Sequence, residues 1–184
     1  MPGYAAIFEA VTTDPRYLAN LDCGEPRPGH PEGTVRAHIV ELESNLERMR
    51  PLLTDEECWR LKLLIDCHDT FKSQAQPGVS ITDPNSHASL ARAFLATHCD
   101  DPDLLAMVQF HDEPFALYRQ AEKKGACDAV RFNRLLAAIR DWNLFLAFAI
   151  IDGCTAGKSR EPLHWLFRQV GNRVQTRFTA DILA

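Results

Sequence analysis

The sequence predicts an all-α fold, an irregular helical bundle that forms a single domain. Apolar residues recur in steps of three and four along several segments, which is the spacing of one face of a helix. No segment shows convincing alternation of apolar and polar residues, the pattern of a half-buried strand. Proline, glycine and capping residues divide the chain into helical stretches, and a length of 184 residues suits one domain.

The first long helix follows a loop. Residues 22–33 are rich in proline and glycine and are expected to lack regular structure. From Val35 to Met49 the apolar positions follow steps of four and three, which predicts an amphipathic helix at about 34–50. Pro51 is expected to end this helix, because proline lacks the amide hydrogen that the next turn needs.

Capping residues and helix breakers set the later elements. Thr54 opens the second helix with a capping box in which Glu57 is the third helical residue, and the apolar face continues to about Phe71. Ser86 and Asp101 are expected to cap two further helices. A loop is expected at 74–85, and helices at about 86–99, 102–111, 115–123, 128–152 and 161–178.

The composition is that of an ordinary globular domain. Apolar residues make up 46% of the chain and charged residues 24%, which excludes a disordered tail, a fibre and a small disulfide scaffold. The formal net charge is −5, from 20 basic and 25 acidic residues, so the surface has no basic excess for binding nucleic acid. The expected partner is therefore a small diffusible substrate, while the sequence leaves the oligomeric state open.

The sequence predicts a cytoplasmic protein with no membrane association. The longest apolar run, Leu144 to Ile151, has eight residues, whereas a membrane span needs about 20. The first residues lack a basic region followed by an apolar stretch, so no signal peptide is expected. The cysteines have no CxxC spacing, and a domain of this size needs no disulfides, so reduced thiols are expected. They are Cys23, Cys58, Cys67, Cys99, Cys127 and Cys154.

Several histidines and aspartates lie where a free charge would be poorly solvated. His68 is at the centre of an apolar helix face and Asp69 follows it, while His38 borders the apolar face of the preceding helix. Asp152 ends the apolar run LFLAFAIID. Burying a carboxylate beside an imidazole is costly unless a partner neutralises it, and a divalent cation can bind both. An exposed aspartate at a helix end is the alternative interpretation of Asp152.

The order of these residues resembles a known family. His38, the pair His68-Asp69 and Asp152 follow the signature of the HD-domain metal-dependent phosphohydrolases over about residues 30–160. The segments LLIDCHDTFK and IIDGCTAGK resemble the family's metal-bearing helices, and HPEGTVRAH resembles the start of the HD domain in tRNA nucleotidyltransferases. The chain lacks the nucleotidyltransferase head of those enzymes and the GYP-type extension of one phosphodiesterase subclass.

The resemblance implies a helical bundle, HD-domain-like, around one or two divalent metal ions. Imidazole and carboxylate ligands suit Fe, Mn, Co, Ni or Zn. One metal would be held by His38, His68, Asp69 and Asp152. His87 and His111 match the additional histidines of family members that hold two metals, and they would bind a second ion with Asp69 bridging. The metal-binding core would span about 30–160, with the C-terminal helix at about 161–178 beside it.

The implied activity is hydrolysis of a phosphomonoester or phosphodiester, with a nucleotide as one possible substrate. The metals would acidify a bound water and offset charge on the phosphoryl group. Asp69 and Lys72 are the expected catalytic residues, with Lys72 on the substrate phosphate or its leaving group. A surface lysine at the helix end is the alternative for Lys72. Two other functions stay open. A di-iron oxygenase that uses dioxygen has the same order of ligands, and a non-catalytic binding module could be stabilised by metal.

Three further charged or titratable residues near the expected ligands have more than one interpretation. His30 and Glu32 precede the first expected ligand and either fix an imidazole tautomer or are loop residues. Lys158 follows Asp152 and can reach a phosphate, although a solvated loop position is favoured. His98 and His164 are interpreted as structural residues.

Overall fold

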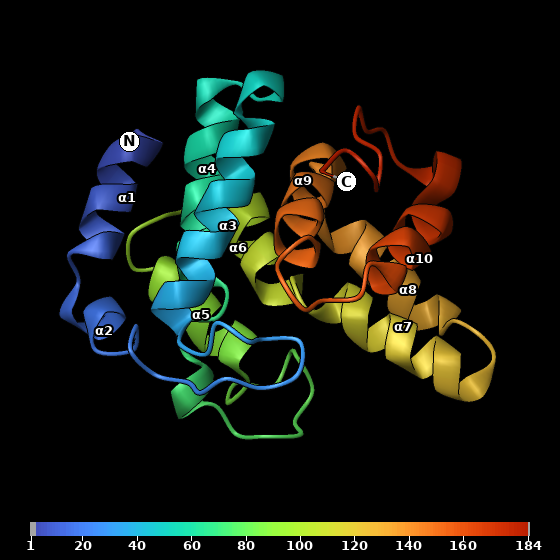
Figure 1. The fold of residues 1–184 in the computed structure, drawn as a ribbon, viewed down its shortest axis with the longest axis horizontal. Helices are drawn as coiled ribbons and strands as arrows, with labels where there is room; N and C mark the ends of the chain where they lie inside the picture. The colour runs from blue at the N-terminus through green and yellow to red at the C-terminus, as the bar shows by residue number, and fades with distance from the viewer. Residues whose placement is uncertain (1–2, 184) are drawn as a thin grey trace.

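The computed structural model describes residues 3–183, and over this range the chain is an all-α bundle without strands (Figure 1). The predicted fold class is confirmed. The helices are α1 (Tyr4–Thr12), α2 (Pro15–Leu18), α3 (Val35–Met49), α4 (Asp55–Cys67), α5 (His87–Leu95), α6 (Pro102–Phe110), α7 (Glu113–Lys124), α8 (Ala129–Ala138), α9 (Trp142–Gly153) and α10 (Glu161–Val170). Short 3-10 turns occupy Arg50–Leu52, Lys72–Gln74 and Gly171–Arg173. Among the described helices, none combines the length and the apolar character needed to cross a bilayer.

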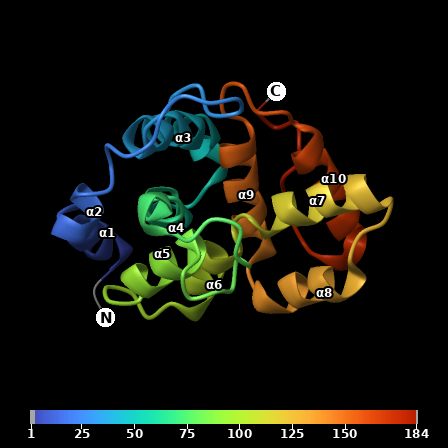
Figure 2. The same cartoon turned by 90° about the horizontal axis from the view of Figure 1, so that it is seen from below.

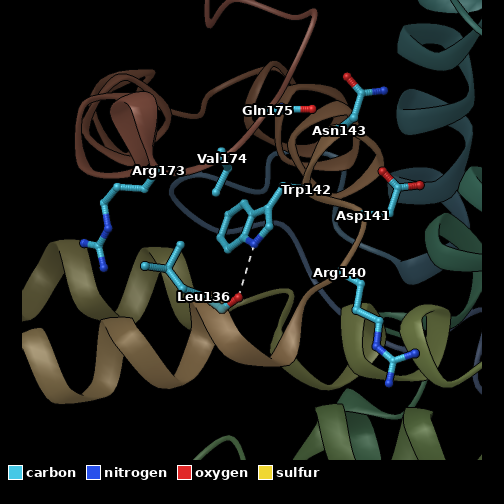
Figure 3. Close-up of a pocket in the computed structure, with 8 residues that line it drawn as sticks. All are labelled: Leu136, Arg140, Asp141, Trp142, Asn143, Arg173, Val174 and Gln175. Carbon is cyan, nitrogen blue, oxygen red and sulfur yellow. Dashed lines mark hydrogen bonds between the residues drawn. The ribbon is translucent and has the colours of Figure 1, made fainter.

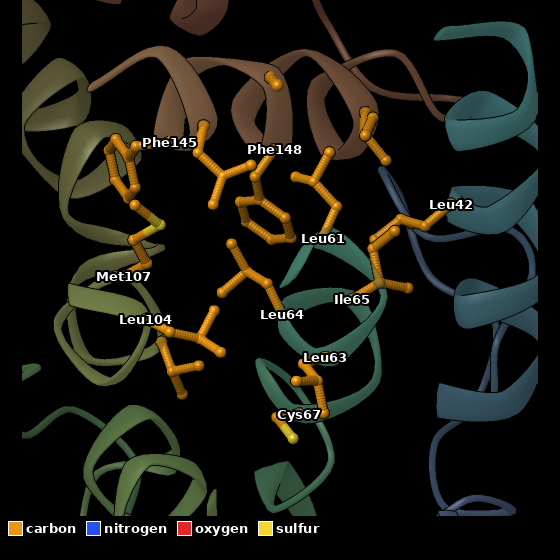
Figure 4. Packing of buried hydrophobic residues seen from close by; sticks show 14 of the residues in the cluster. Leu42, Leu61, Leu63, Leu64, Ile65, Cys67, Leu104, Met107, Phe145 and Phe148 are labelled. Atoms are coloured by element: carbon orange, nitrogen blue, oxygen red, sulfur yellow. The ribbon is translucent and has the colours of Figure 1, made fainter. Parts of the chain in front are cut away.

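Helix α4 lies at the centre of the bundle. It packs against α1, α3, α5, α6 and α9, as the view in Figure 2 shows. Leu61, Leu63, Leu64 and Ile65 are fully buried along it. Side chains from α3, α4, α6 and α9 meet in one apolar cluster (Figure 4). Because α4 is enclosed on several sides, the residues that follow its last turn are also carried into the interior.

Helix α9 is apolar on all sides and is buried accordingly. Its residues 144–148 are all buried, together with Ile150 and Ile151. A helix without a polar face belongs in a protein interior. The helix therefore carries Asp152, one residue from its end, up against the ends of α3 and α4.

The predicted capping signals are confirmed. The Thr54 hydroxyl accepts the backbone N–H of Glu57, and the Glu57 carboxylate accepts the backbone N–H of Thr54 at 2.8 Å. Ser86 caps α5, and Asp101 accepts the backbone N–H of Asp103 at the start of α6. These caps act within one turn of chain, which is why the sequence alone predicts them.

The prediction of one long helix at 128–152 is wrong, because the structure divides this segment into α8 and α9. Ile139 has an extended conformation with φ −96° and ψ 125°. The Asp103 carboxylate accepts the backbone N–H groups of Arg140 and Asp141 at 2.8 and 3.0 Å. Asp141 then caps α9 by accepting the N–H of Leu144. A contact from another helix, together with the cap at Asp141, makes this break.

Two helix ends also differ from expectation. The second helix was expected to reach about Phe71 but ends at Cys67, because the Thr70 hydroxyl takes the Asp66 carbonyl that a further helical N–H would use. The last helix was expected to reach about 178 but ends at Val170. Gly171 has φ 44°, a left-handed conformation that glycine adopts without strain and that stops the helix. Helices α1 and α2 lie where the sequence predicted no element.

Candidate metal centre

The structure brings the six predicted ligands into two adjoining groups. His38 lies on α3 and Asp152 on α9, while His68 and Asp69 directly follow α4. His87 begins α5, and His111 directly follows α6. Within residues 3–183, the candidate ligand atoms of His38, His68 and Asp152 lie within 4.8 Å of one another. The candidate ligand atoms of Asp69, His87 and His111 meet the same condition.

Asp69 lies between the two groups and directs one carboxylate oxygen toward each. Its Oδ2 is 3.4 Å from His68 Nε2, in the first group. Its Oδ1 is 3.4 Å from His111 Nε2 and 3.8 Å from His87 Nε2, in the second. The Nε2 atoms of His87 and His111 are 3.2 Å apart. In the first group, His38 Nε2 is 3.1 Å from Asp152 Oδ1. A carboxylate in this position can bridge two cations.

The ends of two helices fix the orientation of two imidazoles. His68 Nδ1 donates to the carbonyl of Ile65 at 2.8 Å, and His111 Nδ1 donates to the carbonyl of Val108 at the same distance. Both carbonyls belong to a last helical turn, where backbone acceptors lack intrahelical partners. Because Nδ1 is bonded to a carbonyl in each ring, Nε2 of each ring points to the shared centre.

The buried acceptors of this centre are not satisfied by protein donors. His68 is 1% exposed and Asp69 is 6% exposed. Neither His68 Nε2 nor Asp69 Oδ1 has a hydrogen-bond partner among the described residues. A buried acceptor without a partner is costly. A divalent cation in either group would satisfy the unpartnered acceptor there, so the donor set fits metal ions.

The charges of the centre suit a cation as well. Burial lowers the pKa of His68, so this imidazole is held neutral, as a metal ligand must be. Burial alone would raise the pKa of Asp69, but the ammonium group of Lys72 opposes it, and the pKa lies well below its usual range. Asp152 behaves in the same way, with Lys158 opposing the effect of burial. Both carboxylates are therefore ionised at neutral pH.

Glu32 stands behind His38, on the side away from the centre. Its Oε1 is 2.8 Å from His38 Nδ1 and 2.9 Å from His30 Nδ1. A carboxylate behind a ligating imidazole fixes the ring orientation and increases its basicity. The sequence left Glu32 and His30 open between this role and a plain loop position. The 2.8 Å approach of Glu32 to His38 Nδ1 favours the first for Glu32, which is itself hydrogen-bonded to His30.

Replacing Glu32 with glutamine is expected to weaken metal binding by about 10- to 100-fold, because the negative charge behind His38 is lost. Competition with a chromogenic chelator measures this affinity. Glu25→Gln is the matched control, since Glu25 is exposed in the same loop. Equal affinities of the two variants would mean that Glu32 does not support a ligand.

Two residues lie closer to the centre than the sequence indicated. Lys158 was expected in a solvated loop, but its Nζ is 2.6 Å from Asp152 Oδ1. Asp112 was given no role as a ligand, and its Oδ2 is 3.3 Å from His87 Nε2 on a partly exposed side chain. No local sequence pattern predicts the position of Lys158, because the loop after α9 must fold back to bring it to Asp152. The position of Asp112 could have been predicted from the sequence, because it follows directly after the predicted ligand His111.

Of the other residues singled out in the sequence, Lys72 lies at the centre and two histidines lie away from it. Lys72 contacts Asp69 Oδ2. His98 pairs with Asp14 at 3.2 Å, and His164 pairs with Asp181 at 2.9 Å. Neither of these two histidines belongs to a group that includes the predicted ligands.

A pocket of about 640 Å³ opens onto the centre. His111, Asp152, Lys72 and Lys158 contribute to its lining. A larger hollow of about 910 Å³ lies elsewhere, around Trp142 at the start of α9, where this helix meets the C-terminal segment (Figure 3). It is lined by Leu136, Arg140, Asp141, Trp142, Asn143, Arg173, Val174 and Gln175. None of the predicted ligands lines that hollow, so the smaller pocket is the candidate substrate site.

Comparisons with known proteins gave no match: no family model fits the chain, and neither a curated protein nor a solved structure is significantly similar to it. The molecule is thus an all-helical domain with buried groups of histidine and aspartate that can bind metal.

Proposed function

We propose that this protein is a metal-dependent phosphohydrolase of the HD-domain type. His38, His68, Asp69 and Asp152 would hold one divalent ion, and His87, His111 and Asp69 a second. The observation that carries the proposal is the position of Asp69, whose two oxygens face separate groups of imidazoles. The unpartnered acceptors on His68 and Asp69 support it.

The residues around the ligands suit a phosphoryl group. Divalent ions, when bound, lower the pKa of a coordinated water and offset charge on phosphoryl oxygens. Lys72 and Lys158 each contact a carboxylate of the centre and also line the pocket. From there both ammonium groups can bind phosphoryl oxygens as the substrate enters. Phe148 packs beside His68, with ring centroids 5.2 Å apart, and excludes water from that side of the imidazole.

The proposal is tested by assaying hydrolysis without oxygen. We expect the full chain, loaded with Mn²⁺, Co²⁺ or Zn²⁺ in an anaerobic chamber, to release nitrophenol from 4-nitrophenyl phosphate or its diester. Asp112→Asn serves as a variant outside the proposed ligand set. Turnover that requires iron and dioxygen would contradict hydrolysis and indicate the di-iron oxygenase. A metal-loaded chain that turns over neither ester, with or without oxygen, would indicate a binding module.

Replacing Lys72 with alanine is expected to lower kcat/KM by about 10- to 100-fold, because a hydrogen bond to a charged group is lost in the transition state. Metal content is expected to stay the same, since Lys72 is not a ligand. Steady-state kinetics and metal analysis of the same sample measure both quantities. Lys123→Ala, an exposed lysine on α7, is the control. Unchanged kinetics would return Lys72 to a surface role.

A further inference from the structure

The pocket over the centre is rich in cations although the chain as a whole is acidic. Arg27, Lys72, Arg119 and Lys158 line it. The carboxylates that line it are those of Asp112 and Asp152, both at the end next to the predicted ligands. In a chain with a net charge of −5, such a local excess of positive charge attracts anions into one place.

Two of the four cations are paired with carboxylates of the centre and two are not. Lys72 and Lys158 are held by the carboxylates of Asp69 and Asp152. Arg27 and Arg119 are exposed, and neither makes an ion pair within residues 3–183. A phosphoryl group bound by the two lysines therefore leaves two guanidinium groups of the same pocket available. A guanidinium presents a planar fork of donors that matches a carboxylate or a phosphate.

Two aromatic rings add apolar surface to the wall of this pocket. Phe115 on α7 lines the pocket and is 48% exposed, and Phe148 lines it from α9. Arg119 lies one turn after Phe115, with its guanidinium carbon 5.8 Å from the centroid of that ring. An exposed aromatic ring beside an unpaired guanidinium offers contact area and charge together. A volume of about 640 Å³ lies within the range of sites for small ligands.

We propose that the substrate is a phosphate ester whose alcohol part is apolar and carries a second anionic group, either a carboxylate or a further phosphate. Arg119 and Arg27 bind that second group, and Phe115 contacts the apolar part. Binding of the phosphoryl group at the centre rests on the proposed function. Selection for the second anion follows from the pocket residues themselves, so the two can be tested apart.

The test is calorimetric binding of phosphonates, which cannot be hydrolysed, to the full chain loaded with Mn²⁺. The probes are benzylphosphonate, 4-carboxybenzylphosphonate and 1,4-xylylenediphosphonate, which share one ring. We expect one of the doubly anionic probes to bind at least about tenfold more tightly than benzylphosphonate, as one added charged hydrogen bond implies. The tighter of the two distinguishes a carboxylate from a second phosphate. Arg119→Gln and Arg27→Gln should remove the preference, and Arg92→Gln, outside the pocket, should keep it.

The possible outcomes separate the two proposals. A preference that depends on Arg119, in a protein that hydrolyses no ester, would support this inference and overturn the phosphohydrolase. Equal affinity for all three probes, or no binding of any, would overturn this inference even in a protein that hydrolyses phosphate esters. A preference that survives in both pocket variants would also overturn it, because other residues would then bind the second anion.

Discussion

Replacing Asp69 with asparagine is expected to release both metal ions and to abolish hydrolysis. The change keeps the size of the side chain but removes the negative charge that faces His68 on one side and His111 on the other. Loss of a residue behind a metal ligand already costs about 10- to 100-fold in affinity or activity, and loss of a shared ligand should cost more than that for each ion. Metal content by mass spectrometry and kcat/KM on the same preparation measure the result.

Asp112→Asn is the matched control for this experiment. Asp112 lies 3.3 Å from His87 Nε2 but on a partly exposed side chain, and we give it no ligand role. Its variant is expected to keep both metals. If Asp69→Asn also kept both metals, the bridging position of Asp69 would be wrong. If Asp112→Asn lost one metal, Asp112 would join the ligands of the second ion.

Replacing Leu64 with alanine is expected to lower the free energy of unfolding by about 2–5 kcal/mol. Leu64 is fully buried on α4, at the centre of the apolar cluster in Figure 4. Truncation removes buried methyl groups and leaves a cavity that the surrounding helices cannot close, since α4 is packed on several sides. Urea unfolding followed by circular dichroism measures the loss.

Val40→Ala is the control for the core substitution. Val40 lies on α3 with 61% of its surface exposed, so its truncation is expected to change stability by less than about 0.5 kcal/mol. A loss of under about 1 kcal/mol for Leu64→Ala would contradict the central position of α4. A metal ion that binds only the folded state would stabilise it by mass action, so both variants are compared with metal removed.

Features that depend on a few neighbouring residues could be predicted from the sequence. The capping box of Thr54 and Glu57 closes within one helical turn, and the structure contains it. The apolar spacing of α3 and α4 predicted which faces are buried. It placed His68 at the centre of one buried face and His38 at the border of another, and the structure buries both. Buried polar residues on such faces are unusual enough to indicate a site.

Features that depend on distant contacts could not be predicted in this way. The break between α8 and α9 is made by Asp103, which accepts two backbone N–H groups from a segment far along the chain. Lys158 reaches Asp152 because its loop folds back, and no local pattern specifies that path. Arg119 and Phe115 line the pocket because of where α7 packs. The sequence indicates only that they lie one helical turn apart, and so side by side.

Metal analysis of the full chain, purified without oxygen and without a tag, tests the central claim most directly. Mass spectrometry is expected to find about two equivalents of Fe, Mn, Co, Ni or Zn per chain, in keeping with a carboxylate that bridges two ions. Absence of bound metal after incubation with Mn²⁺, Fe²⁺, Co²⁺ and Zn²⁺, in a chain whose circular dichroism is still helical, would contradict the metal centre and with it the proposed hydrolysis.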